Sequence, residues 1–229
     1  MRSKVFYVLE CGWNWRGDIN EAFRLIDASK ECGGSMVKFQ LYDIDKIKKP
    51  SDDNYPGLKS CQLTKDQMHQ LYGHAVMVDI EIGFSVFDEE RLKWLDDIDI
   101  KRYKIASRST QNLKLCQQIV NKRKPIIASC NRKDNDVLKM YDKVDYLFCL
   151  PRREILKNGV TNFPNIFHID LGYTGFSDHT TGIEWAIKAI DRGASIIEKH
   201  ITLDRNAYGW DQSGSALPVE FKRLVDYGK

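Results

Sequence analysis

Short apolar runs alternate with helix-forming segments about eight times along this chain, and this alternation restricts the fold more than any other feature. The strand-like runs are residues 5–10, 35–42, 78–86, 102–107, 125–129, 144–150, 175–180 and 196–202. Segments with a helical period of hydrophobic residues lie between them, at residues 18–32, 64–74, 88–95, 110–121, 134–141 and 181–192. Alternating strands and helices favour a parallel α/β architecture, and eight repeats predict a (β/α)8 TIM barrel forming one domain over residues 1–229.

Three helix starts carry recognisable capping signals, and two connections are expected to be irregular. Asp18 and Thr64 stand where N-cap residues are needed, and Pro218 suits the first position of a closing helix that ends near residue 227. Residues 43–61 are expected to form a long polar loop, and residues 151–173 are the least regular part of the pattern.

Composition and charge exclude several classes of protein. The 229 residues carry a formal net charge of only +3, which gives no support to a nucleic-acid partner. No apolar run is long enough to span a membrane, and the first residues contain no signal-peptide core. The six cysteines are scattered without a Cys-x-x-Cys pair, as expected for free thiols in a reducing compartment. The sequence therefore predicts a cytoplasmic protein.

Residues 175–202 contain the most informative pattern, a strand, a helix and a second strand. Side chains two residues apart on a strand face the same way, so Ser177 shares a face with His179, and Glu198 shares a face with His200. Each histidine alone is more often a structural residue than a ligand. Two at matched positions on successive strands instead favour a site for Zn, Mn or Fe that leaves positions open for water and substrate.

Polar side chains also occur near the carboxyl ends of the other strands, which is where TIM barrels have their active sites. They are Glu10, Lys38, Gln40, Ser85, Lys104, Ser107 and Ser129. Two lysines with several hydroxyls predict a binding site for phosphate or carboxylate, and two glutamates near a metal predict general acid–base groups. Each residue alone has a simpler interpretation as a surface charge or a cap, and Asp211 alone is most often a turn residue. Their recurrence at one end of the barrel favours the functional interpretation.

Four motifs together resemble the sialic acid synthase (N-acetylneuraminate synthase) family. They are residues 175–180 (GFSDHT), 197–200 (IEKH), 37–40 (VKFQ) and 103–107 (YKIAS), and the first two are the more specific. The resemblance implies a TIM-barrel catalytic domain that condenses phosphoenolpyruvate with an N-acetylated amino sugar aldehyde such as N-acetylmannosamine. The products would be a sialic-acid-like 2-keto sugar acid and phosphate. A divalent metal would be required, Mn first, with Mg, Zn, Co or Fe as alternatives.

The same resemblance implies a role for each polar residue at the strand ends. The implied metal ligands are His179 and His200, the catalytic carboxylates are Glu10 and Glu198, the phosphoenolpyruvate-binding residues are Lys38, Ser85, Lys104, Ser107, Ser129 and Ser177, and the sugar contacts are Gln40 and Asp211. Ser85 stands where the family usually has threonine, which keeps the hydroxyl. The family also implies a homodimer.

The chain departs from the family pattern in three loops. Residues 14–17 (NWRG) stand where the family has Asn-His-Asn-Gly, and residues 129–131 (SCN) replace Ser-Thr-Gly. Residues 149–154 (CLPRRE) stand where the family has a cysteine followed by small polar residues and Tyr-Pro. The family's C-terminal antifreeze-like domain is also expected to be missing. These departures motivate an alternative, a degenerate barrel that binds phosphoenolpyruvate, a sugar acid or a partner synthase without turnover. A phosphosugar isomerase would share the phosphate site but gives no reason for the histidine pair.

Overall fold

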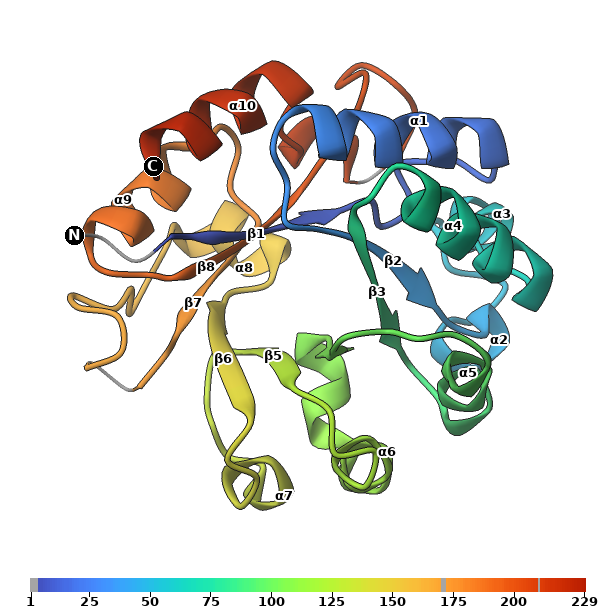
Figure 1. The fold of residues 1–229 in the computed structure, drawn as a ribbon, viewed down its shortest axis with the longest axis horizontal. Coiled ribbons are helices and arrows are strands. Elements are labelled where there is room, and N and C mark those ends of the chain that lie inside the picture. Colours follow the sequence, from blue (N-terminus) through green and yellow to red (C-terminus); the bar gives the residue numbers. More distant parts are fainter. Residues whose placement is uncertain (1–3, 170–171, 210) are drawn as a thin grey trace.

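Eight parallel strands close into a barrel in the computed structural model, which describes residues 4–169, 172–209 and 211–229 (Figure 1). The strands are β1 (Phe6–Glu10), β2 (Met36–Leu41), β3 (Glu81–Val86), β4 (Tyr103–Ile105), β5 (Ile126–Cys130), β6 (Val144–Cys149), β7 (Gly175–Asp178) and β8 (Ile196–His200). Each strand pairs with the next in sequence, and β8 pairs with β1. The predicted TIM barrel is confirmed.

Helices surround the barrel on its outer side (Figure 1). The longer ones are α1 (Ile19–Glu31), α4 (Lys65–Met77), α5 (Glu89–Trp94), α6 (Leu113–Val120), α8 (Arg152–Asn158), α9 (Glu184–Asp191) and α10 (Pro218–Tyr227). The remaining turns are α2 (Ile44–Ile47), α3 (Tyr55–Ser60), α7 (Asp136–Lys139) and the 3-10 turns η1 (Leu95–Asp97), η2 (Ser107–Gln111) and η3 (Gln212–Gly214). Asp18 accepts a hydrogen bond from the backbone N–H of Asn20, and Thr64 forms a capping box with Gln67, so both predicted N-caps are confirmed.

Several predicted element boundaries are wrong. The expected loop at residues 43–61 contains α2, which has only four residues, and α3, which contains Pro56 and Gly57 and buries no residue, so neither shows a hydrophobic helical period in the sequence. The third strand begins at Glu81 rather than residue 78 because α4 continues to Met77. The fourth strand ends at Ile105, so Ser107 begins the turn η2 instead of ending a strand.

The last third of the chain differs from the expectation in three further places. The irregular region at residues 151–173 contains α8, although its residues 170 and 171 lie outside the described part. Helix α9 begins at Glu184, three residues later than expected, and β7 ends at Asp178. The N-terminal residues 1–3, where no signal peptide is expected, also lie outside the described part.

Apolar side chains fill the amino-terminal half of the barrel interior. They are Val8, Met36, Ile127, Leu147 and Ile196, all buried. Two residues further along the same strands the side chains are those of Glu10, Lys38, Ser129, Cys149 and Glu198. Because side chains alternate between the two faces of a strand, this second layer points into the same interior at its carboxyl-terminal end. The barrel therefore has an apolar base and a polar mouth.

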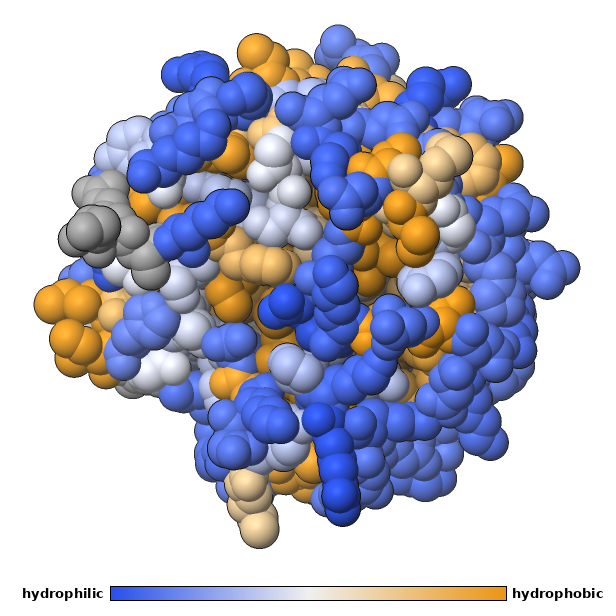
Figure 2. All heavy atoms as spheres, in the orientation of Figure 1, coloured by the Kyte–Doolittle hydropathy of each residue, from blue (hydrophilic) through white to orange (hydrophobic). Residues whose placement is uncertain are grey.

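Polar side chains cover most of the molecular face in Figure 2, and apolar side chains appear there in small groups. The most exposed large apolar residues include Met140 and Tyr208, which lie far apart in the sequence. Among the helices of the described ranges, none has the length and apolar content needed to cross a bilayer.

Candidate active site

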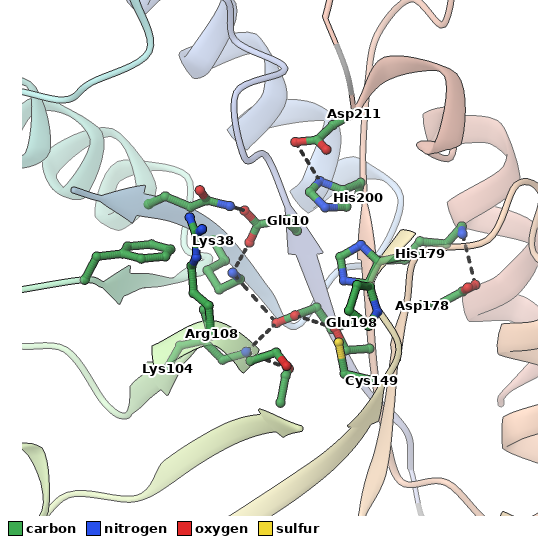
Figure 3. Close-up of a pocket in the computed structure, with 18 residues that line it drawn as sticks. Glu10, Lys38, Lys104, Arg108, Cys149, Asp178, His179, Glu198, His200 and Asp211 are labelled. Carbon is green, nitrogen blue, oxygen red and sulfur yellow. Dashed lines mark hydrogen bonds and ion pairs between the residues drawn. The ribbon is translucent and has the colours of Figure 1, made fainter. Parts of the chain in front are cut away.

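A cavity of about 400 Å³ opens among the carboxyl ends of the barrel strands (Figure 3). Eleven of the twelve residues predicted for the site line it: Glu10, Lys38, Gln40, Lys104, Ser107, Ser129, Ser177, His179, Glu198, His200 and Asp211. Ser85 does not line the cavity. Its hydroxyl is fully buried and accepts a hydrogen bond from Lys38 Nζ at 2.9 Å, so Ser85 lies behind the lysine.

The register of the strands brings these residues together. Glu10 lies opposite Lys38 on one side and opposite His200 on the other, because β1 pairs with both β2 and β8. Ser177 lies opposite Glu198 across β7 and β8. Residues from distant parts of the sequence therefore become neighbours at one height in the barrel.

The two histidines form one side of the cavity, with ring centroids 5.3 Å apart and ring planes inclined by 58°. His179 follows the last residue of β7, and His200 ends β8. Burial, followed by the neighbouring His200 ring, lowers the pKa of His179 to about 3, so this imidazole is neutral near pH 7. The Nδ1 atom of His200 is buried without a hydrogen-bond partner among the described residues, and it lies 3.8 Å from Asp211 Oδ2.

Two buried lysines form the opposite side of the cavity. Lys104 Nζ donates hydrogen bonds to Ser129 Oγ at 2.8 Å and to the Ile105 carbonyl at 3.1 Å. Burial lowers the pKa of Lys104. Burial acts in the same direction on Lys38, but the adjacent Glu10 and Glu198 outweigh it and raise the pKa of Lys38. Lys38 is therefore held as a cation.

Two carboxylates lie between the lysine side and the histidine side (Figure 3). Glu10 forms an ion pair with Lys38 and accepts a hydrogen bond from Gln40 Nε2 at 2.8 Å. Glu198 Oε2 lies 3.5 Å from Lys104 Nζ and 3.9 Å from Lys38 Nζ. Burial alone would raise the pKa of Glu198, but the two lysines and a hydrogen bond from Ser177 lower it to about 2. Glu198 is therefore ionised near neutral pH.

The histidine pair fits a divalent cation. His179 is neutral, and the buried Nδ1 of His200 has a lone pair or proton that no described residue satisfies. Within the described part of the chain, no group of three or more His, Cys, Asp or Glu side chains is arranged to hold a metal ion. The two imidazoles would therefore be the protein donors, with the other positions left to water or substrate oxygen.

Some residues at the site were not predicted from the sequence. Arg108 and Cys149 line the cavity, and Arg108 directly follows Ser107 in η2. Lys199 donates hydrogen bonds to Asp178 Oδ2 at 2.9 Å and to the Thr180 carbonyl at 2.8 Å, with the Lys199 and Asp178 side chains fully buried. The period-two pattern of β6 could have identified Cys149, which lies two residues after the buried Leu147.

Comparison with known proteins gives consistent matches over almost the whole chain. N,N'-diacetyllegionaminic acid synthase of Legionella pneumophila is 30% identical over 252 residues, covering 96% of this chain and 70% of that protein. Human N-acetylneuraminate-9-phosphate synthase is 28% identical, covering 96% of this chain and 68% of its own length. The crystal structure of N-acetylneuraminic acid (sialic acid) synthetase from Leptospira borgpetersenii, in complex with citrate, superposes with a TM-score of 0.83 at 25% identity, covering 99% of this chain and 83% of that one.

The fold and these matches define the class as a TIM-barrel enzyme similar to the sialic acid synthases. The model of the NeuB family matches residues 25–140 and 151–229. The chain belongs to the NeuB family, and the predicted resemblance is confirmed. Residues 141–150, which contain the whole of β6, lie outside the matched segments and overlap the start of the loop at residues 149–154 that departs from the family pattern.

Proposed function

We propose that this chain condenses phosphoenolpyruvate with an N-acetylated amino sugar aldehyde to give a sialic-acid-like 2-keto sugar acid and phosphate. The observation that carries the proposal is the arrangement of one cavity, with two lysines on one side, two histidines on the other and two carboxylates between them. This arrangement provides separate places for an anionic donor and for an aldehyde.

The lysine side suits phosphoenolpyruvate. Lys38 and Lys104 would bind its carboxylate and phosphate, and the hydroxyls that would assist them are Ser107, Ser129 and Ser177. The cavity volume of about 400 Å³ is within the range of small-molecule sites. Lysines near the phosphate would also stabilise the charge on the departing phosphate. We assign Ser85 to positioning Lys38, because its hydroxyl touches that ammonium group and not the cavity.

The reaction consumes one water: it forms one carbon–carbon bond and, at carbon 2, replaces the carbon–oxygen bond to phosphate by a carbon–oxygen bond to the oxygen of water. Carbon 3 of phosphoenolpyruvate attacks the aldehyde carbon, and the carbonyl oxygen takes a proton. Water then adds to carbon 2, and the resulting tetrahedral intermediate releases phosphate to leave the keto group. The ionised Glu198 would stabilise positive charge that develops at carbon 2. Glu10, which is held by Lys38 and Gln40, would accept the proton of the attacking water.

His179 and His200 would hold a divalent metal at the aldehyde side, with Mn as the first candidate. When bound there, the metal supplies Lewis-acid polarisation of a carbonyl oxygen. The histidines must be neutral to bind it, and the low pKa of His179 meets that requirement near pH 7.

The acceptor would be an N-acetylated amino sugar in its open-chain form. The relatives are named for N-acetylneuraminate-9-phosphate and N,N'-diacetyllegionaminic acid, both acids of N-acetylated sugars. Gln40 and Asp211 line the cavity and would contact the sugar. Burial raises the pKa of Asp211.

Phosphate release tests the proposal. Purified chain with Mn²⁺, phosphoenolpyruvate and N-acetylmannosamine should release phosphate, and omission of the sugar should reduce the release to background. His200→Ala should abolish the release and reduce bound Mn²⁺ from about one per chain to a small fraction. Failure of the wild-type chain with every N-acetylated hexosamine and pentose aldehyde would contradict the proposal. The degenerate barrel without turnover is not favoured. Equal activity in the wild type and His200→Ala would contradict the proposed role of the histidine pair.

A further inference from the structure

Arg108 is a cavity-lining cation that the proposed reaction does not yet use. It lies in η2, immediately after the strand that carries Lys104, and its side chain is exposed. Figure 3 shows it on the same side of the cavity as Lys38 and Lys104, away from His179 and His200. Unlike the two lysines, Arg108 forms no hydrogen bond or ion pair with another residue of the described ranges.

The charges around the cavity explain why a free guanidinium matters there. Among the described lining residues, Lys38 and Lys104 are balanced by the carboxylates of Glu10 and Glu198, and Asp211 adds a further carboxyl group beside His200. Lys199 is balanced by Asp178 in a buried pair. The two inner lysines therefore bring little net positive charge to an incoming anion.

Phosphoenolpyruvate carries a carboxylate and a phosphate group, and a phosphate monoester has a charge of roughly −1.5 to −2 at pH 7. The inner residues on the lysine side are close to neutral together, and the divalent metal of the proposed function would lie on the other side, with the histidines. Lys38 and Lys104 can donate hydrogen bonds to such an anion, but their charges do not compensate it. An arginine at the mouth can do so at low cost, because its guanidinium remains partly hydrated until the phosphate arrives and can then form two parallel hydrogen bonds.

We infer that Arg108 binds the phosphate group of the substrate at the mouth of the cavity, outside the two lysines. This inference rests on the proposed function for the choice of substrate. A phosphate group can come from two sources, the enol phosphate of phosphoenolpyruvate or a phosphorylated sugar acceptor. The lysine side of the cavity favours phosphoenolpyruvate, because Arg108 lies with Lys38 and Lys104 and apart from the histidines where the aldehyde would bind.

Isothermal titration of the full chain with phosphoenolpyruvate and with inorganic phosphate tests the inference. Arg108→Gln should raise the Kd for both by about tenfold, and Arg108→Lys should lose less, because it keeps the charge but not the fork of donors. Arg132→Gln is the matched control. It removes an exposed arginine after β5 that does not line the cavity, and its Kd values should stay within about twofold of wild type. Equal thermal midpoints would show that the variants are folded.

Steady-state kinetics separate the two sources of phosphate. A raised KM for phosphoenolpyruvate with an unchanged KM for N-acetylmannosamine supports the enol phosphate. A raised KM confined to N-acetylmannosamine 6-phosphate supports phosphate binding by Arg108 but moves it to the acceptor. Unchanged Kd and KM values for all phosphate compounds in Arg108→Gln overturn the inference. If the wild type binds inorganic phosphate, Arg108→Gln weakens that binding, and the wild type makes no product, then the proposed function fails and this inference stands. If wild type binds no phosphate compound, both fail.

Discussion

Replacing Glu198 with glutamine removes the negative charge that the two cavity lysines share. The carboxylate lies 3.5 Å from Lys104 Nζ and 3.9 Å from Lys38 Nζ, and Ser177 donates a hydrogen bond to it at 2.8 Å. Burial opposes ionisation, but these partners lower the pKa of Glu198 from 4.5 to about 2. At about 1.4 kcal/mol per pKa unit, the ionised form gains about 3 kcal/mol in the folded state. We expect Glu198→Gln to reduce the free energy of unfolding by about this amount at pH 7, since it leaves buried ammonium groups undercompensated.

Urea unfolding of the metal-free chain measures this difference, and its pH dependence has a definite sign. The pKa of Glu198 is lower in the folded state, so its contribution is complete above pH 4.5 and is lost as the pH falls toward 2. The gap between wild type and Glu198→Gln should therefore narrow to about half near pH 3. Glu31→Gln, at the exposed end of α1, should change the stability by less than about 0.5 kcal/mol. Equal stability of wild type and Glu198→Gln at pH 7, or a gap that widens in acid, would refute the reasoning.

Three further predictions follow from buried contacts. Ser85→Ala removes the hydroxyl that accepts a hydrogen bond from Lys38, so the chain should lose about 1 kcal/mol of stability and its KM for phosphoenolpyruvate should rise several-fold. Ser85→Thr keeps a hydroxyl and should leave the stability and the KM close to the wild-type values. Gly12 has φ +51°, and an added Cβ would lie 3.0 Å from Asp211 Oδ2 and 3.1 Å from His200 Cε1. Gly12→Ala should therefore reduce the free energy of unfolding by about 1 kcal/mol or more and lower the amount of Mn²⁺ that the chain retains, and unchanged metal content would contradict this. Burial raises the pKa of all six cysteine thiols, so Ellman's reagent at pH 8 should react slowly with the native chain. After unfolding it should react with all six thiols, and a rapid reaction of the native chain would contradict their burial.

The barrel could be predicted from the sequence because two periods of hydrophobic residues are sufficient to define it. The helical period of residues 19–31 and the strand that contains Lys38 are clear, and so is the terminal helix that begins at Pro218. Helix α2 could not be predicted because its four residues contain little more than one turn, and α3 could not be predicted because it contains Pro56 and Gly57 and buries none of its residues. The end of β4 was misplaced for a related reason, since an apolar run does not indicate where a 3-10 turn begins.

The sequence predicted most of the residues of the candidate site, but not which side chains reach the cavity and which lie behind others. Alternation along a strand states which face Ser85 occupies, but not that the longer side chain of Lys38 covers it. Arg108 was missed because it lies in a turn, where strand alternation no longer applies. Its charge alone gives no signal in a chain with 35 lysines and arginines, and only the cavity distinguishes it from a surface residue.

The most direct test of the account is carbon NMR of the reaction with phosphoenolpyruvate labelled with ¹³C at carbon 3. With Mn²⁺, N-acetylmannosamine and the wild-type chain, the label should move to a methylene carbon of a 2-keto sugar acid, with one phosphate released for each new carbon–carbon bond. Appearance of the label only in the methyl group of pyruvate would mean that phosphoenolpyruvate is hydrolysed, and an unchanged spectrum would mean that it is not turned over. Either result would contradict a cavity that brings an enol phosphate and an aldehyde together.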